Sequence, residues 1–220
     1  MSRLLLFDID CTLIDTGGAG MAALKETACA LFGAEGPELD LAGSTDSGIV
    51  RGMLDHFESD IELEDFYRVY LEKLSPNLAS YRGTILPGVT TLLDEITQSD
   101  ASLGLLTGNI ADGAKAKIDH YELAQYFSIE VGAYGDDHHD RNELGPVAIE
   151  RANAAYGVVF QAEHSVVIGD TPKDIACGQA VGAVTLAVAT GRFSVEELKA
   201  CGADLAVEDL NDSRVRPFLM

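Results

Sequence analysis

Short runs of apolar residues alternate along the chain with longer stretches in which apolar residues recur at helical spacing. The short runs are continuously apolar, which is typical of parallel strands that helices cover on both faces. Strands are predicted at Leu4–Phe7, Leu103–Leu106, Ile129–Val131, Val166–Ile168 and Val184–Val188. Because strands alternate with helices, the pattern predicts an α/β fold with a doubly wound, Rossmann-like parallel sheet.

The alternation is interrupted between residues 16 and 85, where only helical spacing is found. Helices are predicted at Met21–Phe32, Ser47–Phe57 and Leu63–Leu78. Turn-forming residues flank this stretch, Thr16-Gly17-Gly18 on one side and Pro87-Gly88 on the other. We therefore predict an all-helical domain at residues 16–85, inserted into a sheet-containing core of residues 1–15 and 86–220.

The composition predicts a soluble globular protein and excludes several kinds of partner. Of the 220 residues 47% are hydrophobic, and 36 acidic against 15 basic residues give a formal charge of −21. This charge repels nucleic acids and anionic membrane surfaces, and no local basic patch offsets it. No apolar run is long enough for a signal-peptide core or a membrane span, so we expect a cytoplasmic protein without nucleic-acid or membrane partners.

The four cysteines lack the spacing of a zinc site or of a disulfide framework. They are Cys11, Cys29, Cys177 and Cys201. We expect reduced and mostly buried thiols.

The first predicted strand runs directly into Asp8 and Asp10, with Thr12 two residues further on. The carboxyl ends of strands are where open α/β sheets bind ligands. If the strand continues, both carboxylates lie on one face, where like charges need a cation or a shared proton. A divalent metal ion is the simplest solution, and surface acids in an acidic chain are the alternative.

Two further strand ends carry polar residues. Thr107-Gly108-Asn109 follows the second run, with a helix expected to start near Ala111. This stretch is either an anion cradle or a simple Thr/Asn helix cap. Asp170 and Asp174 follow the run that ends at Ile168, with Pro172 at the expected helix start. Oxygen ligands that converge from several strand ends suit Mg²⁺.

These elements resemble, in order and spacing, the motifs of the haloacid dehalogenase-like (HAD) superfamily. Asp8-x-Asp10-x-Thr12-Leu13 resembles motif one, Thr107-Gly108-Asn109 motif two, and Gly169-Asp170-x-x-x-Asp174 motif four, while Arg141 occupies the place of the basic third motif. The helical insertion resembles the type-1 cap of the family. Phosphoglycolate phosphatase-like and β-phosphoglucomutase-like members share this layout.

The resemblance implies a role for each acid. Asp8 is expected to be the nucleophile that forms an aspartyl-phosphate. Asp10 is expected to protonate the leaving oxygen and then to deprotonate the hydrolytic water. Mg²⁺ is expected to bind Asp8, the Asp10 backbone carbonyl and Asp170, with Asp174 as a further or supporting ligand.

The resemblance also implies how the phosphoryl group is held. Thr107, Gly108 and Asn109 are expected to bind its oxygens, and Arg141 to neutralise its charge. Thr12 is expected to steady the loop that carries Asp10.

Two residues depart from the family pattern. Cys11 stands where glycine is common, and we expect little effect because the position needs a small side chain. Arg141 stands where lysine is usual, and its fixed fork of donors changes the geometry. If Arg141 pairs with neighbouring acids instead, Lys173 or Lys115 is the alternative cation.

Other classes of function are weaker candidates. Gly18–Ala23 fits a dinucleotide fingerprint with Asp40 about twenty residues later, which is compatible with an oxidoreductase. The fingerprint should follow the first strand directly, whereas nine residues separate Phe7 from Gly17. These glycines fit better as a hinge into the cap. A phosphorylated receiver module uses similar residues, but it is shorter and carries the phosphoacceptor on a later strand.

We therefore predict a Mg²⁺-dependent phosphatase that hydrolyses a small phosphorylated metabolite through an aspartyl-phosphate. A phosphomutase of the β-phosphoglucomutase type is the alternative, because such enzymes share the core and the cap. Dehalogenases of the superfamily lack the acid at the position of Asp10, so this residue favours phosphoryl transfer.

Overall fold

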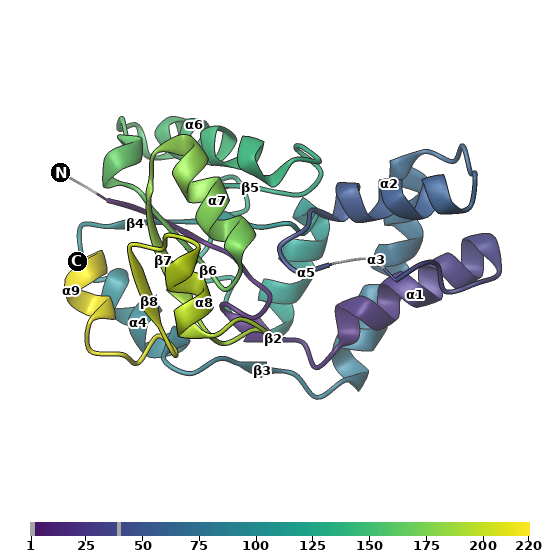
Figure 1. Ribbon diagram of the computed structural model, residues 1–220, viewed down its shortest axis with the longest axis horizontal. Helices are drawn as coiled ribbons and strands as arrows, with labels where there is room; N and C mark the ends of the chain where they lie inside the picture. Colours follow the sequence, from purple (N-terminus) through teal and green to yellow (C-terminus); the bar gives the residue numbers. More distant parts are fainter. Residues whose placement is uncertain (1–2, 39–40) are drawn as a thin grey trace.

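The computed structural model describes residues 3–38 and 41–220 and contains a parallel sheet with the strand order β5-β4-β1-β6-β7-β8 (Figure 1). Its strands are β1 (Leu4–Phe7), β4 (Ser102–Leu106), β5 (Gly132–Ala133), β6 (Val166–Gly169), β7 (Val184–Val188) and β8 (Leu205–Val207). Every neighbouring pair within these residues is parallel. The predicted α/β class and parallel sheet are confirmed.

Helices cover the sheet on both faces, which explains why its central strands are continuously apolar. The helices of the core are α4 (Val89–Ile96), α5 (Ala111–His120), α6 (Leu144–Tyr156), α7 (Pro172–Val181), α8 (Val195–Ala200) and α9 (Val215–Leu219), with short 3-10 turns η1 (Arg141–Glu143) and η2 (Ala162–His164). In β1, Leu5 and Phe7 pack toward α4, α5 and α9. Leu4 and Leu6 pack toward α6 on the opposite face. Alternating side chains thus enter two different cores.

Two strand predictions differ from the structure. The run Ile129–Val131 is a turn, and β5 begins only at Gly132. Val131 is apolar because it packs into the core beneath α6, and not because it lies in a strand. Gly132 suits the pairing since a Cβ there would lie 2.8 Å from the Leu105 carbonyl oxygen. The edge strand β8 was not predicted, because three residues give too short a pattern.

The inserted segment forms a helical cap beside the sheet (Figure 1). It consists of α1 (Ala19–Phe32), α2 (Asp46–His56) and α3 (Leu63–Ser80). These helices have a core of their own, in which Phe66 and Leu74 are fully buried. Ile110 of the sheet-containing part joins that core, so the cap rests on it. The exact division of the chain at residues 16 and 85 stays a prediction.

The chain leaves and re-enters the core through two adjacent short strands. β2 (Ile14–Asp15) and β3 (Thr84–Ile85) pair antiparallel. Gly17 follows β2 with a left-handed φ of 62°, and a Cβ there would lie 2.5 Å from the Arg82 carbonyl oxygen. Glycine is therefore needed where the two connections cross. The strand before Gly18 is β2, which pairs antiparallel with β3 and is not part of the parallel sheet, so the dinucleotide fingerprint does not follow β1 directly. Asp40 lies outside the described residues.

The cysteines agree with the prediction only in part. All four are free thiols. Only Cys177 is buried, whereas Cys11 is half-buried and Cys29 and Cys201 are exposed, so the expectation of mostly buried thiols is wrong. The exposed pair lies on α1 and at the end of α8, where other residues form the buried faces of these helices.

Among the described helices, none combines the length and apolarity of a membrane-spanning segment.

The packing of α4 predicts a stability difference between two adjacent residues. Leu92 is fully buried against the sheet, and Thr91 beside it is exposed. We expect Leu92→Ala to lower the free energy of unfolding by about 2–5 kcal/mol, because it leaves a cavity in the core. Thr91→Ala is the matched control and should change it by less than about 0.5 kcal/mol. Urea unfolding measures both, and equal effects would contradict this account of the core.

Candidate active site

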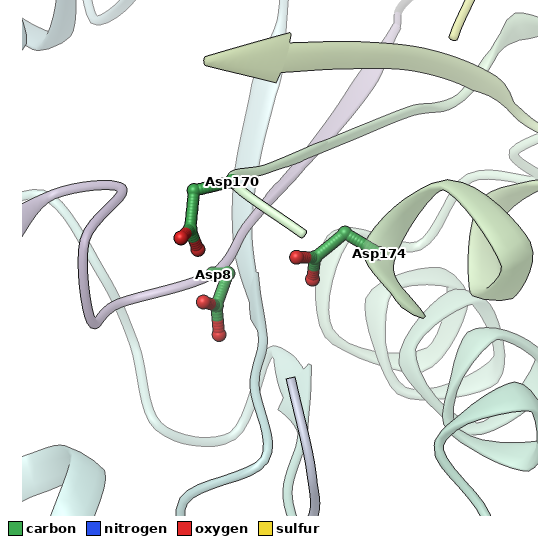
Figure 2. A group of neighbouring side chains, drawn as sticks. All are labelled: Asp8, Asp170 and Asp174. Atoms are coloured by element: carbon green, nitrogen blue, oxygen red, sulfur yellow. The ribbon is translucent and has the colours of Figure 1, made fainter. Parts of the chain in front are cut away.

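Three buried carboxylates meet at the carboxyl edge of the sheet. One oxygen from each of Asp8, Asp170 and Asp174 lies within 4.8 Å of the others (Figure 2). Asp8 and Asp170 follow β1 and β6, which are adjacent parallel strands and so end at the same edge. The sequence pattern predicted this convergence, and the structure brings the three side chains together.

The start of α7 holds Asp174 in the cluster. Asp174 Oδ2 accepts a hydrogen bond from the Thr171 backbone N–H at 2.9 Å, while the Thr171 hydroxyl accepts one from the Asp174 N–H at 3.3 Å. This capping box begins the helix at Pro172, as predicted. A Cβ at Gly169 would lie 2.1 Å from Asp174 Cγ, so glycine is required for the carboxylate to approach.

Arg141 is the cation that contacts this cluster. Its guanidinium Nη2 lies 3.1 Å from Asp8 Oδ1 and donates a short hydrogen bond to Asp174 Oδ1. It is buried at the start of η1, in the place predicted for the basic residue. The alternative cations point elsewhere, since Lys115 pairs with Asp119 on the surface and Lys173 donates to the Ser44 hydroxyl at 2.7 Å.

The electrostatics of the cluster favour an additional cation. Burial raises the pKa of Asp8 to about 6; the charge of Arg141 lowers it, and repulsion by Asp174 and Asp10 raises it. Burial and the charges of Asp174 and Asp8 raise the pKa of Asp170 to about 8. With all three acids ionised, Arg141 leaves two negative charges uncompensated, and hard oxygen donors so close together fit a divalent ion such as Mg²⁺.

Asp10 lies apart from the three clustered acids. Its carboxylate accepts hydrogen bonds from Lys117 Nζ at 2.8 and 2.6 Å and from the Asn109 amide at 2.8 Å. Among the described residues, the group of possible metal ligands does not include the Asp10 side chain. If Asp10 contributes to a metal site, only its backbone carbonyl is available for that role.

Lys117 was not among the predicted site residues. It is buried on α5, beside the inward-facing Ala114 and Ile118. The available signal was a lysine at helical spacing within a buried apolar stripe. Because a lysine is almost never fully buried without a partner, this pattern indicates a charge partner nearby. Its partner Asp10 is 107 residues away in sequence, so the pattern alone could not name the pair.

The motif that follows β4 does not form a helix cap. The first residue before α5 is Ile110, and in the described part of the chain no side chain of a Thr or Asn caps this helix. Thr107 Oγ1 instead accepts from the Asn109 amide at 2.8 Å. A Cβ at Gly108 would lie 2.0 Å from the Ser44 carbonyl oxygen, so the cap crosses directly over this glycine. The helix-cap alternative is therefore wrong.

The loop after Asp10 corrects two expectations. Cys11 has a left-handed φ of 56°, so glycine suits this position because of its backbone and not merely because it is small. The Thr12 hydroxyl is buried and forms no hydrogen bond with the described residues. The loop is held by backbone bonds instead, including Leu13 N–H to the Ile9 carbonyl at 2.9 Å.

A cap loop at residues 43–46 closes over the site. The Gly43 carbonyl accepts from Arg141 Nη1 at 3.2 Å. Asp46, which was not predicted, accepts from the Ile110 N–H at 2.9 Å and donates its own N–H to the Gly108 carbonyl at 2.6 Å. Burial raises the pKa of Asp46 to about 6, while nearby Lys117 lowers it.

Core and cap together line an open cavity of about 350 Å³. Asp8, Asp10 and Lys117 line its core side. Apolar cap residues line the opposite side, among them Leu24 and Ile49. Asp8 and Asp170 of the carboxylate cluster thus face a space large enough for a small molecule.

A family model of haloacid dehalogenase-like hydrolases matches residues 5–188. The chain therefore belongs to the haloacid dehalogenase-like hydrolases, and the predicted superfamily and class of enzyme are confirmed.

Individual relatives are distant but match over most of their length. A pyrophosphatase PpaX from Oceanobacillus iheyensis is 24% identical, with 96% of this chain and 94% of that protein covered. A phosphoglycolate phosphatase from Aquifex aeolicus is 26% identical, with 83% of each covered. A putative β-phosphoglucomutase from Thermotoga maritima has a similar fold, with a TM-score of 0.66, 21% identity and 100% of both chains covered. Both groups named in the predicted resemblance are thus found among the similar proteins.

The raised pKa of Asp170 predicts a pH-dependent stability in the metal-free protein. The folded state binds the proton of the Asp170 carboxyl more tightly than the unfolded chain does, where the ordinary pKa is 3.8. The protonated carboxyl therefore stabilises the folded state, and this stabilisation is complete at low pH. It is lost as the pH rises through about 8. Asp170→Asn cannot ionise and so does not lose this stabilisation. Its free energy of unfolding relative to that of the wild type should rise by at least about 1 kcal/mol between pH 4 and 9.

Urea unfolding in EDTA at several pH values measures this difference. Mg²⁺ should stabilise the wild type more at pH 8 than at pH 5, and should stabilise Asp170→Asn much less. A wild-type to variant difference that does not change with pH would contradict the assigned environment of Asp170.

Proposed function

We propose that this hydrolase is a Mg²⁺-dependent phosphatase that cleaves a small phosphate ester through an aspartyl-phosphate on Asp8. One observation carries the proposal: Asp8 lies buried among Asp170, Asp174 and Arg141, and it lines the cavity between core and cap. With Arg141 and a cation bound beside it, the Asp8 carboxylate could approach a phosphoryl group that its own charge would otherwise repel.

In the proposed first step, an Asp8 oxygen attacks the phosphorus and the bond to the leaving oxygen breaks. Asp10 supplies the proton that the leaving oxygen needs. Arg141 neutralises the phosphoryl charge, and Thr107, Gly108 and Asn109 line the same end of the cavity. Asp8, Asp170, Asp174 and the Asp10 backbone carbonyl would hold Mg²⁺, which supplies further positive charge against the phosphoryl oxygens.

In the second step, Asp10 takes a proton from water, the water oxygen attacks the phosphorus, and the bond to Asp8 breaks. Phosphate leaves, and the protonated Asp10 is ready for the next leaving group. The two aspartates need different surroundings for these roles, and they have them. Asp8 is buried against Arg141, whereas the Asp10 side chain is 40% exposed beside Lys117.

The size of the cavity supports a small substrate. A volume of about 350 Å³ suits a metabolite and excludes a polymer. The names of the relatives agree, since phosphoglycolate and pyrophosphate are small phosphorylated molecules. The phosphomutase alternative uses the same core residues and differs in passing the phosphoryl group to a sugar instead of water.

Replacement of the nucleophile tests the proposal. Asp8→Asn should reduce phosphate release from a panel of small phosphate esters by about 10³-fold or more, because the amide cannot form the covalent intermediate. Phosphate release is measured with Mg²⁺ and with EDTA, and activity should require the metal. Asp55→Asn, an exposed cap residue, is the matched control and should keep wild-type activity.

Substantial activity of Asp8→Asn would remove Asp8 as the nucleophile. Isomerisation of a sugar phosphate without phosphate release would identify a mutase instead. A panel that yields neither reaction would contradict both functions.

A further inference from the structure

Lys117 is bound to Asp10 more closely than a surface ion pair requires. Its ammonium donates to both Asp10 oxygens at 2.8 and 2.6 Å, and to the Asn109 side-chain oxygen at 2.6 Å. Three acceptors therefore use all three N–H bonds of the ammonium. The lysine side chain is only 4% exposed, so the contacts form in a shielded environment.

The exposure of the two partners is unequal in an informative way. Lys117 is enclosed, while the Asp10 side chain remains 40% exposed and lines the cavity. The lysine thus holds one side of the carboxylate and leaves the other side open to the cavity. An ion pair that served only to stabilise the fold would gain nothing from keeping the carboxylate accessible.

Lys117 also links Asp10 to the residues that line the phosphoryl end of the site. Asn109 accepts from Lys117 and donates to Asp10 and to the Thr107 hydroxyl, each at 2.8 Å. The four side chains form one closed network across α5, the loop after β1 and the loop after β4. Such a network restricts the rotamers of its members together.

We propose that Lys117 is the positioning residue for Asp10, fixing its carboxylate at the cavity wall for the transfer of a proton from the hydrolytic water. This inference rests on the proposed function. Lys117 acts through Asp10 and leaves the bond-making steps to Asp8 and water. In the step that it supports, the water proton moves to Asp10, the water oxygen bonds to phosphorus, and the bond from phosphorus to Asp8 breaks.

With a suitable substrate, the loss of Lys117 should affect only the second half of the reaction, the hydrolysis of the aspartyl-phosphate. p-Nitrophenyl phosphate has a leaving group that departs without a proton, so formation of the aspartyl-phosphate does not depend on Asp10 with this substrate. Hydrolysis of the intermediate still needs a correctly placed base. A displaced Asp10 should therefore slow the second step and spare the first.

The test uses p-nitrophenyl phosphate with full-length protein, Mg²⁺ and rapid mixing. Lys117→Met keeps an unbranched side chain, one atom shorter, and removes its donors. We expect a burst of about one equivalent of nitrophenolate at a near wild-type rate, followed by a steady-state kcat reduced about 10²-fold. The Mg²⁺ concentration that gives half-maximal activity should not change.

Two further variants control the interpretation. Lys117→Arg can donate to both Asp10 oxygens, so its kcat should stay within about tenfold of the wild type. Lys115→Met changes an exposed lysine on the same helix, paired with Asp119, and should leave both phases unchanged. Thermal unfolding of each variant shows whether the fold is retained, and Lys117→Arg tests the proposal even if Lys117→Met fails to fold.

A double-mutant cycle separates positioning from an independent contribution. If Lys117 acts only through Asp10, Asp10→Asn combined with Lys117→Met should have the kcat of Asp10→Asn alone, within about twofold. If the two substitutions instead reduce kcat multiplicatively in the double variant, the proposal is overturned. An unchanged kcat in Lys117→Met, loss of the burst together with the steady state, or an effect on KM alone would overturn it as well. Activity that survives in Asp8→Asn would instead show that the proposed function has failed.

Discussion

The crowding of buried carboxylates at one edge of the sheet is the constraint on which the rest of the site depends. Asp8, Asp170 and Asp174 come together because β1 and β6 are parallel neighbours and α7 starts immediately after β6. Isolated buried charges are strongly unfavourable, and Arg141 compensates only part of this cluster. The remaining negative charge makes the edge of the sheet suited to a divalent cation, which under the proposed function would also attract the phosphoryl group.

Asp8 and Asp10 show how two acids close in sequence acquire different chemistry. Asp8 ends the strand and stays among carboxylates, whereas Asp10 follows it into a loop and contacts Lys117 and Asn109. The left-handed conformation of Cys11 directly after Asp10 is part of this change of direction. One acid thereby lies among carboxylates beside Arg141, and the other lies beside the cavity with donors on its carboxylate.

The cap contributes to the site through backbone contacts as well as through side chains. Gly43 accepts from Arg141, and Asp46 forms hydrogen bonds with Gly108 and Ile110 across the boundary. Through these contacts the backbone of the described cap residues lies beside the cavity that Asp8 lines. Apolar residues of α1 and α2 line the same cavity, so under the proposed function the cap would contact the leaving group and influence substrate preference.

The sequence by itself determined the parallel sheet, the helical insertion and the acids at the strand ends, because each leaves a local pattern. Continuous apolar runs mark buried strands, and short motifs place Asp8, Thr107 and Asp170 directly after them. The boundary of β5 and the edge strand β8 were missed where the pattern was too short or came from packing of a turn. Only the tertiary structure decided that Lys117 pairs with Asp10 and that Asp46 reaches Ile110. Those contacts join residues far apart in the chain, and no local periodicity records which distant charge will neutralise a buried one.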